Sequence, residues 1–234
     1  MKCVVLQPSY IPWRGVFHLI QRADVFVFYD DVQYDKHGWR NRNRIKTPDG
    51  TKWLTIPVLA KGNVDQGLLI NEAKVSRIEN WPRKHLASLR QSYAKAPFFQ
   101  DYVSLLESFY ASPPDSLADF TIDTTKQLAA ALGLTNTRFL RSSELPVEGT
   151  KTERLLQLLA KVGATHYISG PSAKSYLDAA AFEAAKITLE YQVYDYPEYE
   201  QLHPPYDPAV SILDLLFMKG QSAGEWIWGK GASR

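Results

Sequence analysis

The chain has 234 residues, of which 45% are hydrophobic and 12% aromatic, so it can bury a sizeable core and is not a disordered chain. Its 27 lysines and arginines face 25 aspartates and glutamates, and this near balance argues against a nucleic-acid-binding protein. The single cysteine, Cys3, excludes an internal disulfide framework and a multi-cysteine zinc site. No apolar run is long enough for a transmembrane segment or a signal-peptide core, which predicts a cytoplasmic protein.

The N-terminal third has the pattern of a strand, a loop, a helix and a second strand. Apolar runs predict strands at residues 2–6 and 24–29, and the segment between them divides into a loop over 8–15 and a helix over 16–22. A third strand is expected at residues 52–58. This is a β-loop-α-β unit followed by a further strand.

The middle of the chain carries helical periodicity instead. Helices are predicted over residues 81–93, 98–110 and 116–132, with proline or glycine breaks between them. Strands and helices then alternate again. The expected strands are 137–140, 166–169 and 187–194, and the expected helices are 151–162, 172–185 and 210–218.

This order of elements predicts an α/β fold, a doubly wound and mostly parallel sheet with an inserted helical subdomain. Residues 1–74 and 134–234 would form the α/β domain, and residues 75–133 the helical insertion. Ligands of such sheets bind outside the carboxyl ends of the strands, so the loops that follow the strands are the first places to search for a site.

The loop after the first strand combines side chains that suit a ligand wall. Gln7, Tyr10 and Trp13 lie in a segment that two prolines and a glycine stiffen. The alternative is a packed turn in which Tyr10 and Trp13 belong to the core. His18, in the helix that follows, is a candidate catalytic base or a structural histidine.

The loop after the second strand is the most informative stretch. Five lysines and arginines fall within residues 36–46, and they concentrate positive potential that suits phosphate or carboxylate. On an extended segment the three arginines would share one face and the two asparagines the other. The candidate ligand contacts of this region are Gln33, Trp39, Arg40, Asn41, Arg42 and Asn43. The alternative is a solvated basic strand.

Two aspartates and a third loop complete the candidate site. Asp30 and Asp31 end the second strand, where either could act as general base, bind a metal ion or cap a turn; we prefer Asp30 as the catalytic group. Ser169, Gly170 and Lys174 form a strand-to-helix turn that could hold an anion, although Gly170 could be only a turn residue.

Other chemistries have no sequence signature. The five histidines lack metal-ligand spacing, so no metal is predicted, and the sequence identifies no cofactor. The tyrosines of residues 191–206 are interspersed with prolines, which predicts a segment that packs over the sheet edge. These tyrosines could alternatively line a sugar site.

Several motifs together resemble the WbqC-like protein family over nearly the full chain. They are QPSYIPWRGVF (7–17), ADVFV (23–27), DDVQ (30–33), WRNRNRIK (39–46), YISG (167–170), YLD (176–178) and SILDLLF (211–217). The resemblance implies a role in bacterial O-antigen or other surface-polysaccharide biosynthesis, with transfer of an aminoacyl or acyl group to an amino sugar. The opening unit also looks distantly like that of HIGH-type nucleotidyltransferases, but His18 supplies only one histidine of their pair.

Two hypotheses from different classes follow. The first is a transferase whose ligand is phosphorylated or nucleotide-linked, and a nucleotidyltransferase-like enzyme is a variant of it. The second is a protein that binds the same small molecule without chemistry. Both predict an anion site in the loops described above, and only the first predicts turnover.

Overall fold

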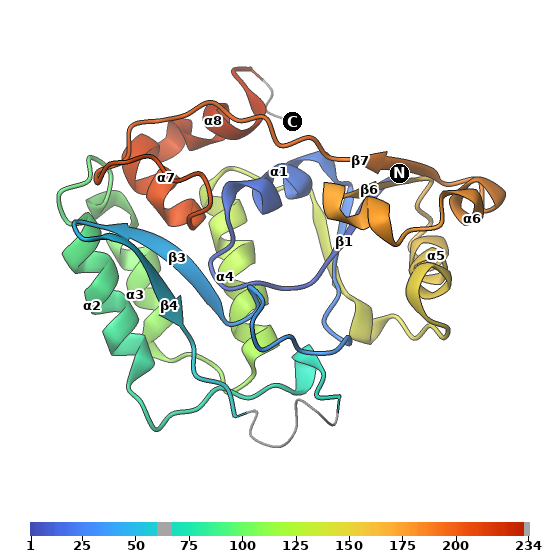
Figure 1. Cartoon of the computed structure of the whole chain (residues 1–234), viewed down its shortest axis with the longest axis horizontal. Helices are drawn as coiled ribbons and strands as arrows, with labels where there is room; N and C mark the ends of the chain where they lie inside the picture. The colour runs from blue at the N-terminus through green and yellow to red at the C-terminus, as the bar shows by residue number, and fades with distance from the viewer. Residues whose placement is uncertain (60–66, 232–234) are drawn as a thin grey trace.

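A five-stranded, fully parallel sheet forms the centre of the computed structural model, which describes residues 1–59 and 67–231 (Figure 1). The strand order is β5-β2-β1-β6-β7. The strands are β1 (Lys2–Leu6), β2 (Val25–Phe28), β5 (Arg138–Arg141), β6 (His166–Ser169) and β7 (Thr188–Tyr191). The prediction of an α/β fold with a mostly parallel sheet is confirmed.

The strand order places a topological switch point between β1 and β6. The chain runs from β1 outward through β2 to β5, then returns to the other side of β1 for β6 and β7. Because all five strands are parallel, their carboxyl ends lie at one edge of the sheet. Gln7 and Asp30 follow two of these strands and Ser169 ends a third, so all three lie at this edge.

Helices cover both faces of the sheet because alternate strand residues point to opposite sides. Val4 and Phe26 pack on one face against α1 (Arg14–Arg22), and Cys3 and Val25 pack on the other face against α5 (Lys151–Lys161). Helix α1 begins at Arg14, two residues before the start that the sequence predicted.

The basic stretch and the expected third strand form a separate antiparallel hairpin. Its strands are β3 (Arg42–Thr47) and β4 (Gly50–Thr55), and neither joins the main sheet. Gly50 adopts φ +105°, a conformation that glycine permits at this tight turn. The sequence identified the cations of β3 but not their pairing, because residues 42–47 lack a clear apolar alternation.

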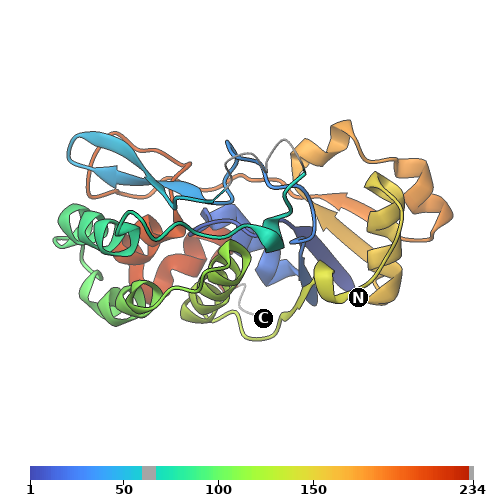
Figure 2. The same ribbon diagram turned by 90° about the horizontal axis from the view of Figure 1, so that it is seen from below.

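The predicted middle helices pack beside this hairpin. They are α2 (Trp81–Tyr93), α3 (Val103–Ala111) and α4 (Leu117–Ala131). Together with α7 (Ile212–Lys219), they share one apolar cluster with α1. Figure 2 shows the hairpin on one side of this half of the molecule and the helices across from it. The division into two domains stays a prediction.

Two C-terminal elements differ from expectation. The helix expected over 172–185 is a short 3₁₀ turn, Pro171–Ser175, followed by α6 (Ala179–Ala184). The carboxylate of Asp178 accepts hydrogen bonds from the Ala180 and Ala181 N–H groups, so a new helix begins there. A last helix, α8 (Glu225–Trp228), has no counterpart in the sequence prediction. No helix in the described part of the chain has the length and apolar character needed to span a membrane.

Candidate functional site

A cavity of about 440 Å³ opens at the carboxyl ends of β1 and β6, beside the switch point of the sheet. Its volume lies in the usual range for small-molecule sites. Segments far apart in sequence line it: Leu6, Ser9, Pro12, Trp13, Val16, Leu19, Trp39, Arg40, Asn43, Gly170, Pro171, Ser172, Tyr194 and Ala209. Most of this wall is apolar, so a charged group within it is informative.

Trp13 forms one wall of the cavity, and Gly15 makes room for it. A Cβ atom at Gly15 would lie 2.3 Å from the Trp13 indole, so only glycine lets the ring fold back over the start of α1. Tyr194 meets the ring edge-on, with centroids 4.8 Å apart. The loop glycine of the sequence motif therefore fixes an aromatic cavity wall.

Arg40 brings the positive charge to the cavity. Its Nη1 atom is inaccessible to solvent and has no hydrogen-bond partner among the described residues. Loss of hydration lowers the pKa of the guanidinium to about 10, and the nearby charge of Asp35 partly opposes this shift. The group stays protonated at neutral pH, so it is a charged donor without an acceptor. An anionic ligand oxygen would satisfy it once the guanidinium turns this nitrogen toward the cavity.

The two asparagines of the basic stretch support the site from behind. Nδ2 of Asn43 donates to the carbonyls of Tyr10 (3.1 Å) and Ile11 (2.8 Å). Ile11 has φ +36°, which is strained for a β-branched residue, so Asn43 holds an unfavourable loop conformation in place. Nδ2 of Asn41 donates to the Ile56 carbonyl at 2.8 Å. The prediction that both amides face away from all three arginines is not met, because Asn43 lines the same cavity as Arg40, and Arg40 precedes β3 in a bend.

Tyr10 is not at the cavity. Its side chain is fully buried, and its hydroxyl shares hydrogen bonds with Nδ1 of His85 (2.8 Å) and with the Tyr110 hydroxyl (2.5 Å). The structure thus places it in the core, in agreement with the alternative weighed for this loop.

Asp30 and Asp31 both turn toward the segment after β5. The carboxylate of Asp30 is fully buried and accepts hydrogen bonds from the Ser143 N–H (3.0 Å), the Ser143 hydroxyl (2.9 Å) and the Ser142 hydroxyl (3.2 Å). Asp31 accepts from the same Ser142 hydroxyl and pairs with Arg154 at 2.5 Å.

The two aspartates do not point to opposite sides as neighbours on a strand do, because β2 ends at Phe28 and the chain is no longer extended. Neither carboxylate is among the cavity-lining residues. The two carboxylates therefore accept hydrogen bonds in the turn that follows β2, which is one strand away from the switch point between β1 and β6.

His18 lies on α1 and faces the C-terminal segment. Its Nδ1 atom is 3.0 Å from the Tyr196 hydroxyl and 3.2 Å from the Gln192 amide nitrogen. Burial, and then the charge of Arg22, lower the pKa of His18 to about 4. The imidazole is therefore neutral at pH 7, and it too is absent from the cavity lining.

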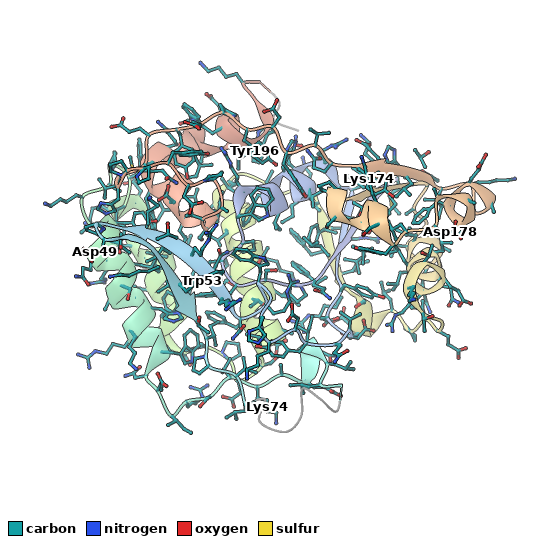
Figure 3. The ribbon with its side chains drawn as sticks, viewed as in Figure 1. Asp49, Trp53, Lys74, Lys174, Asp178 and Tyr196 are labelled. Carbon is teal, nitrogen blue, oxygen red and sulfur yellow. The ribbon has the colours of Figure 1, made fainter. Side chains whose placement is uncertain are left out.

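Of the remaining predicted residues, only Gly170 lines the cavity. Gln7 follows β1 directly, and its carbonyl accepts a 3.5 Å hydrogen bond from Ser9. Gly170 lines the cavity, whereas Ser169 is buried just below it and accepts from the Tyr167 hydroxyl. Lys174, which Figure 3 labels, is exposed, and its Nζ atom lies 5.2 Å from the centre of the Tyr191 ring.

Gln33 is exposed and forms an isolated bridge with Leu69, away from the cavity-lining residues. The structure therefore brings together Trp13, Trp39, Arg40 and Asn43 with Gly170, and it leaves the other predicted contacts outside the lining.

Arg42 and Arg44 share the outward face of the hairpin, whereas Arg40, which the alternation placed on the same face, precedes β3 and lines the cavity. Arg42 stacks over the Trp53 ring at 4.5 Å and donates to the His37 carbonyl. Nε of Arg44 donates to the Ala209 carbonyl at 3.0 Å. Each of these two guanidinium groups has at least one acceptor, although Nε of Arg42, like Nη1 of Arg40, is buried without one.

Several lining residues carried no signal in the sequence. Val16 and Leu19 belong to the regular apolar face of α1, and Ser172 and Ala209 are common loop residues. Tyr194 was suggested only as one of a group of tyrosines. Among residues 1–59 and 67–231, no cluster of three or more histidine, cysteine or acidic side chains is placed to hold a metal ion.

The sequence is similar to known proteins over most of its length. The family model described as "WbqC-like protein family" matches residues 7–225, which include all the loops of the cavity. The chain belongs to the WbqC-like protein family. It is also 39% identical over 228 residues to "Uncharacterized protein Rv1507c" of Mycobacterium tuberculosis, with 97% of each chain covered. No solved structure matches the chain. The resemblance seen in the sequence is therefore confirmed at the level of the family.

Proposed function

We propose that this WbqC-like protein is a cytoplasmic transferase of bacterial surface-polysaccharide (O-antigen-type) biosynthesis. It would move an acyl or aminoacyl group onto the amine of a nucleotide-linked amino sugar. The observation that carries the proposal is the unpaired Nη1 of Arg40 inside an apolar cavity at the switch point of a parallel sheet. A charged donor nitrogen that neither water nor protein satisfies costs folding free energy, and a phosphate oxygen is a suitable acceptor for the guanidinium.

The cavity walls suit the remaining parts of such a ligand. Trp13 offers an aromatic surface for a ring, and the hydroxyls of Ser9 and Ser172 lie among the lining residues. Apolar walls exclude water, which would favour transfer of an activated acyl group to an amine over its hydrolysis. The guanidinium would hold the phosphate and so fix the position of the sugar.

The lining gives specific support to a second candidate, a protein that binds the nucleotide-sugar or phosphate ligand without chemistry. Transfer to an amine requires removal of a proton, and none of the described lining residues is a carboxylate or an imidazole. Asp30 and Asp31 have partners of their own, and His18 faces Tyr196. A transferase would have to use His18 after a rearrangement, or a base brought by the substrate.

Turnover distinguishes the two candidates. The protein would be incubated with nucleotide-linked amino sugars and with acyl thioesters or aminoacyl esters, and the products analysed by mass spectrometry. A sugar nucleotide that gains the mass of the acyl group supports the transferase. Calorimetric binding of the sugar nucleotide without product from any donor supports the binding protein, and absence of binding contradicts both.

A further inference from the structure

The hairpin carries an exposed aromatic surface just outside the cavity. Trp39 and Trp53 are 42% and 45% exposed, and their rings lie 5.1 Å apart at an angle of 39°. The guanidinium of Arg42 is stacked on Trp53, and that of Arg44 lies within 6 Å of both rings, at 5.9 Å and 5.8 Å. We call these four side chains the indole platform; Trp53 is labelled in Figure 3.

The platform is held in place from below. Arg42 donates to the His37 carbonyl, and Arg44 binds the Ala209 carbonyl and the Asp207 carboxylate, the latter at 3.5 Å. These contacts restrict the guanidinium groups and, through stacking, the rings. Large aromatic side chains that are rigid and half-exposed are typical of binding surfaces, since little conformational entropy is lost when a ligand covers them.

The platform is continuous with the cavity. Trp39 lines the cavity and also contacts Trp53, and Arg40 is the next residue in the chain. A ligand with its anionic group on Nη1 of Arg40 can therefore place one ring inside the cavity and extend the other over the platform. A nucleotide-linked sugar has this arrangement, with two ring systems joined by phosphates.

We propose that the indole platform binds the pyranose ring of the nucleotide-linked sugar, while the nucleoside occupies the cavity and the phosphates contact Arg40. This inference rests on the proposed function. Trp39 and Trp53 contact each other, so they leave no flat slot between them for a base. Their exposed faces suit the C–H groups of a sugar ring, and the neighbouring guanidinium groups can donate to its hydroxyls.

The test compares two ligands of the full-length protein by calorimetry. Uridine, guanosine and thymidine diphosphates would be titrated alone and as their conjugates with a hexosamine whose amine is free. Trp53→Ala should weaken binding of the conjugate about three- to tenfold and leave the nucleoside diphosphate unchanged. Trp53→Phe should restore part of the loss. Lys52→Ala is the matched control, because Lys52 is exposed next to Trp53 in the chain but its side chain points to the opposite face of β4. It should change the affinity of neither ligand.

Two results would contradict the platform specifically. One is unchanged affinity of the conjugate in Trp53→Ala, and the other is equal weakening of both ligands. If Trp53→Ala does not fold, Arg42→Gln carries the same comparison, because it removes the cation stacked on Trp53. Failure of all three diphosphates and their conjugates to bind wild-type protein would instead overturn the proposed function, and the platform subsite with it.

Discussion

The Arg40→Gln variant tests whether Arg40 binds a ligand or stabilises the fold. In the ligand-free protein Nη1 is buried without a partner among the described residues, so the native guanidinium weakens the fold. A buried unsatisfied polar group costs about 1–3 kcal/mol, and more if it is charged. Arg40→Gln should therefore leave the free energy of unfolding unchanged or raise it by up to about this amount, which is unusual for a buried substitution.

Ligand affinity should change in the opposite direction. A hydrogen bond to a charged group contributes about 1.5–3 kcal/mol, so loss of one such bond to phosphate should weaken binding about 10- to 150-fold. The wild-type affinity should also fall as ionic strength rises, because a charge pair is partly screened by salt. The variant should show a smaller salt dependence.

Urea denaturation and calorimetry with a nucleotide-linked amino sugar measure the two quantities. The matched control is Arg77→Gln, which removes an exposed arginine that pairs with Asp115, outside the cavity lining. This control should change ligand affinity by less than about twofold. The reasoning would be refuted by a large loss of stability in Arg40→Gln together with unchanged affinity, since Arg40 would then be a structural residue.

Three further predictions concern the fold around the site. Gly15→Ala would press a methyl group onto the Trp13 indole, so the free energy of unfolding in urea should fall by about 1–3 kcal/mol and the ligand should bind more weakly. An unchanged midpoint of unfolding would contradict the close contact between Gly15 and Trp13. Asp30→Asn should lower the free energy of unfolding by about 1–3 kcal/mol, because an amide cannot accept all the hydrogen bonds that Ser142 and Ser143 donate. A variant that keeps its stability but loses turnover would instead support Asp30 as the catalytic group. Burial lowers the pKa of His85 to about 4, whereas an unfolded histidine titrates near 6.5, so the unfolded state takes up the proton first as the pH falls. The free energy of unfolding should therefore fall by up to about 3 kcal/mol between pH 6.5 and 4. Urea denaturation at several pH values measures this dependence, and His85→Gln should flatten it.

The sequence predicted the sheet well because its strands are short apolar runs bounded by turns. Residues 2–6 and 166–169 were placed at the bounds that the structure gives them, and α2 likewise at 81–93. The hairpin was missed, since β3 depends on contacts distant in sequence, such as Asn43 with the strained Ile11.

The candidate site was predicted in location more than in composition. Parallel strands bring their carboxyl ends to one edge, so the loop after β1 and the turn after β6 could be expected to meet. The partners of individual side chains could not be inferred. Asp30 finds its donors 112 and 113 residues away, and no local pattern indicates that Nη1 of Arg40 lacks an acceptor while Nη2 of Arg42 has one.

A crystal structure with a bound nucleotide-linked amino sugar tests the central claim most directly. We predict a phosphate oxygen about 2.7–2.9 Å from Nη1 of Arg40, within the cavity between β1 and β6. A ligand bound at another surface, with Nη1 of Arg40 still unpaired, would contradict the account.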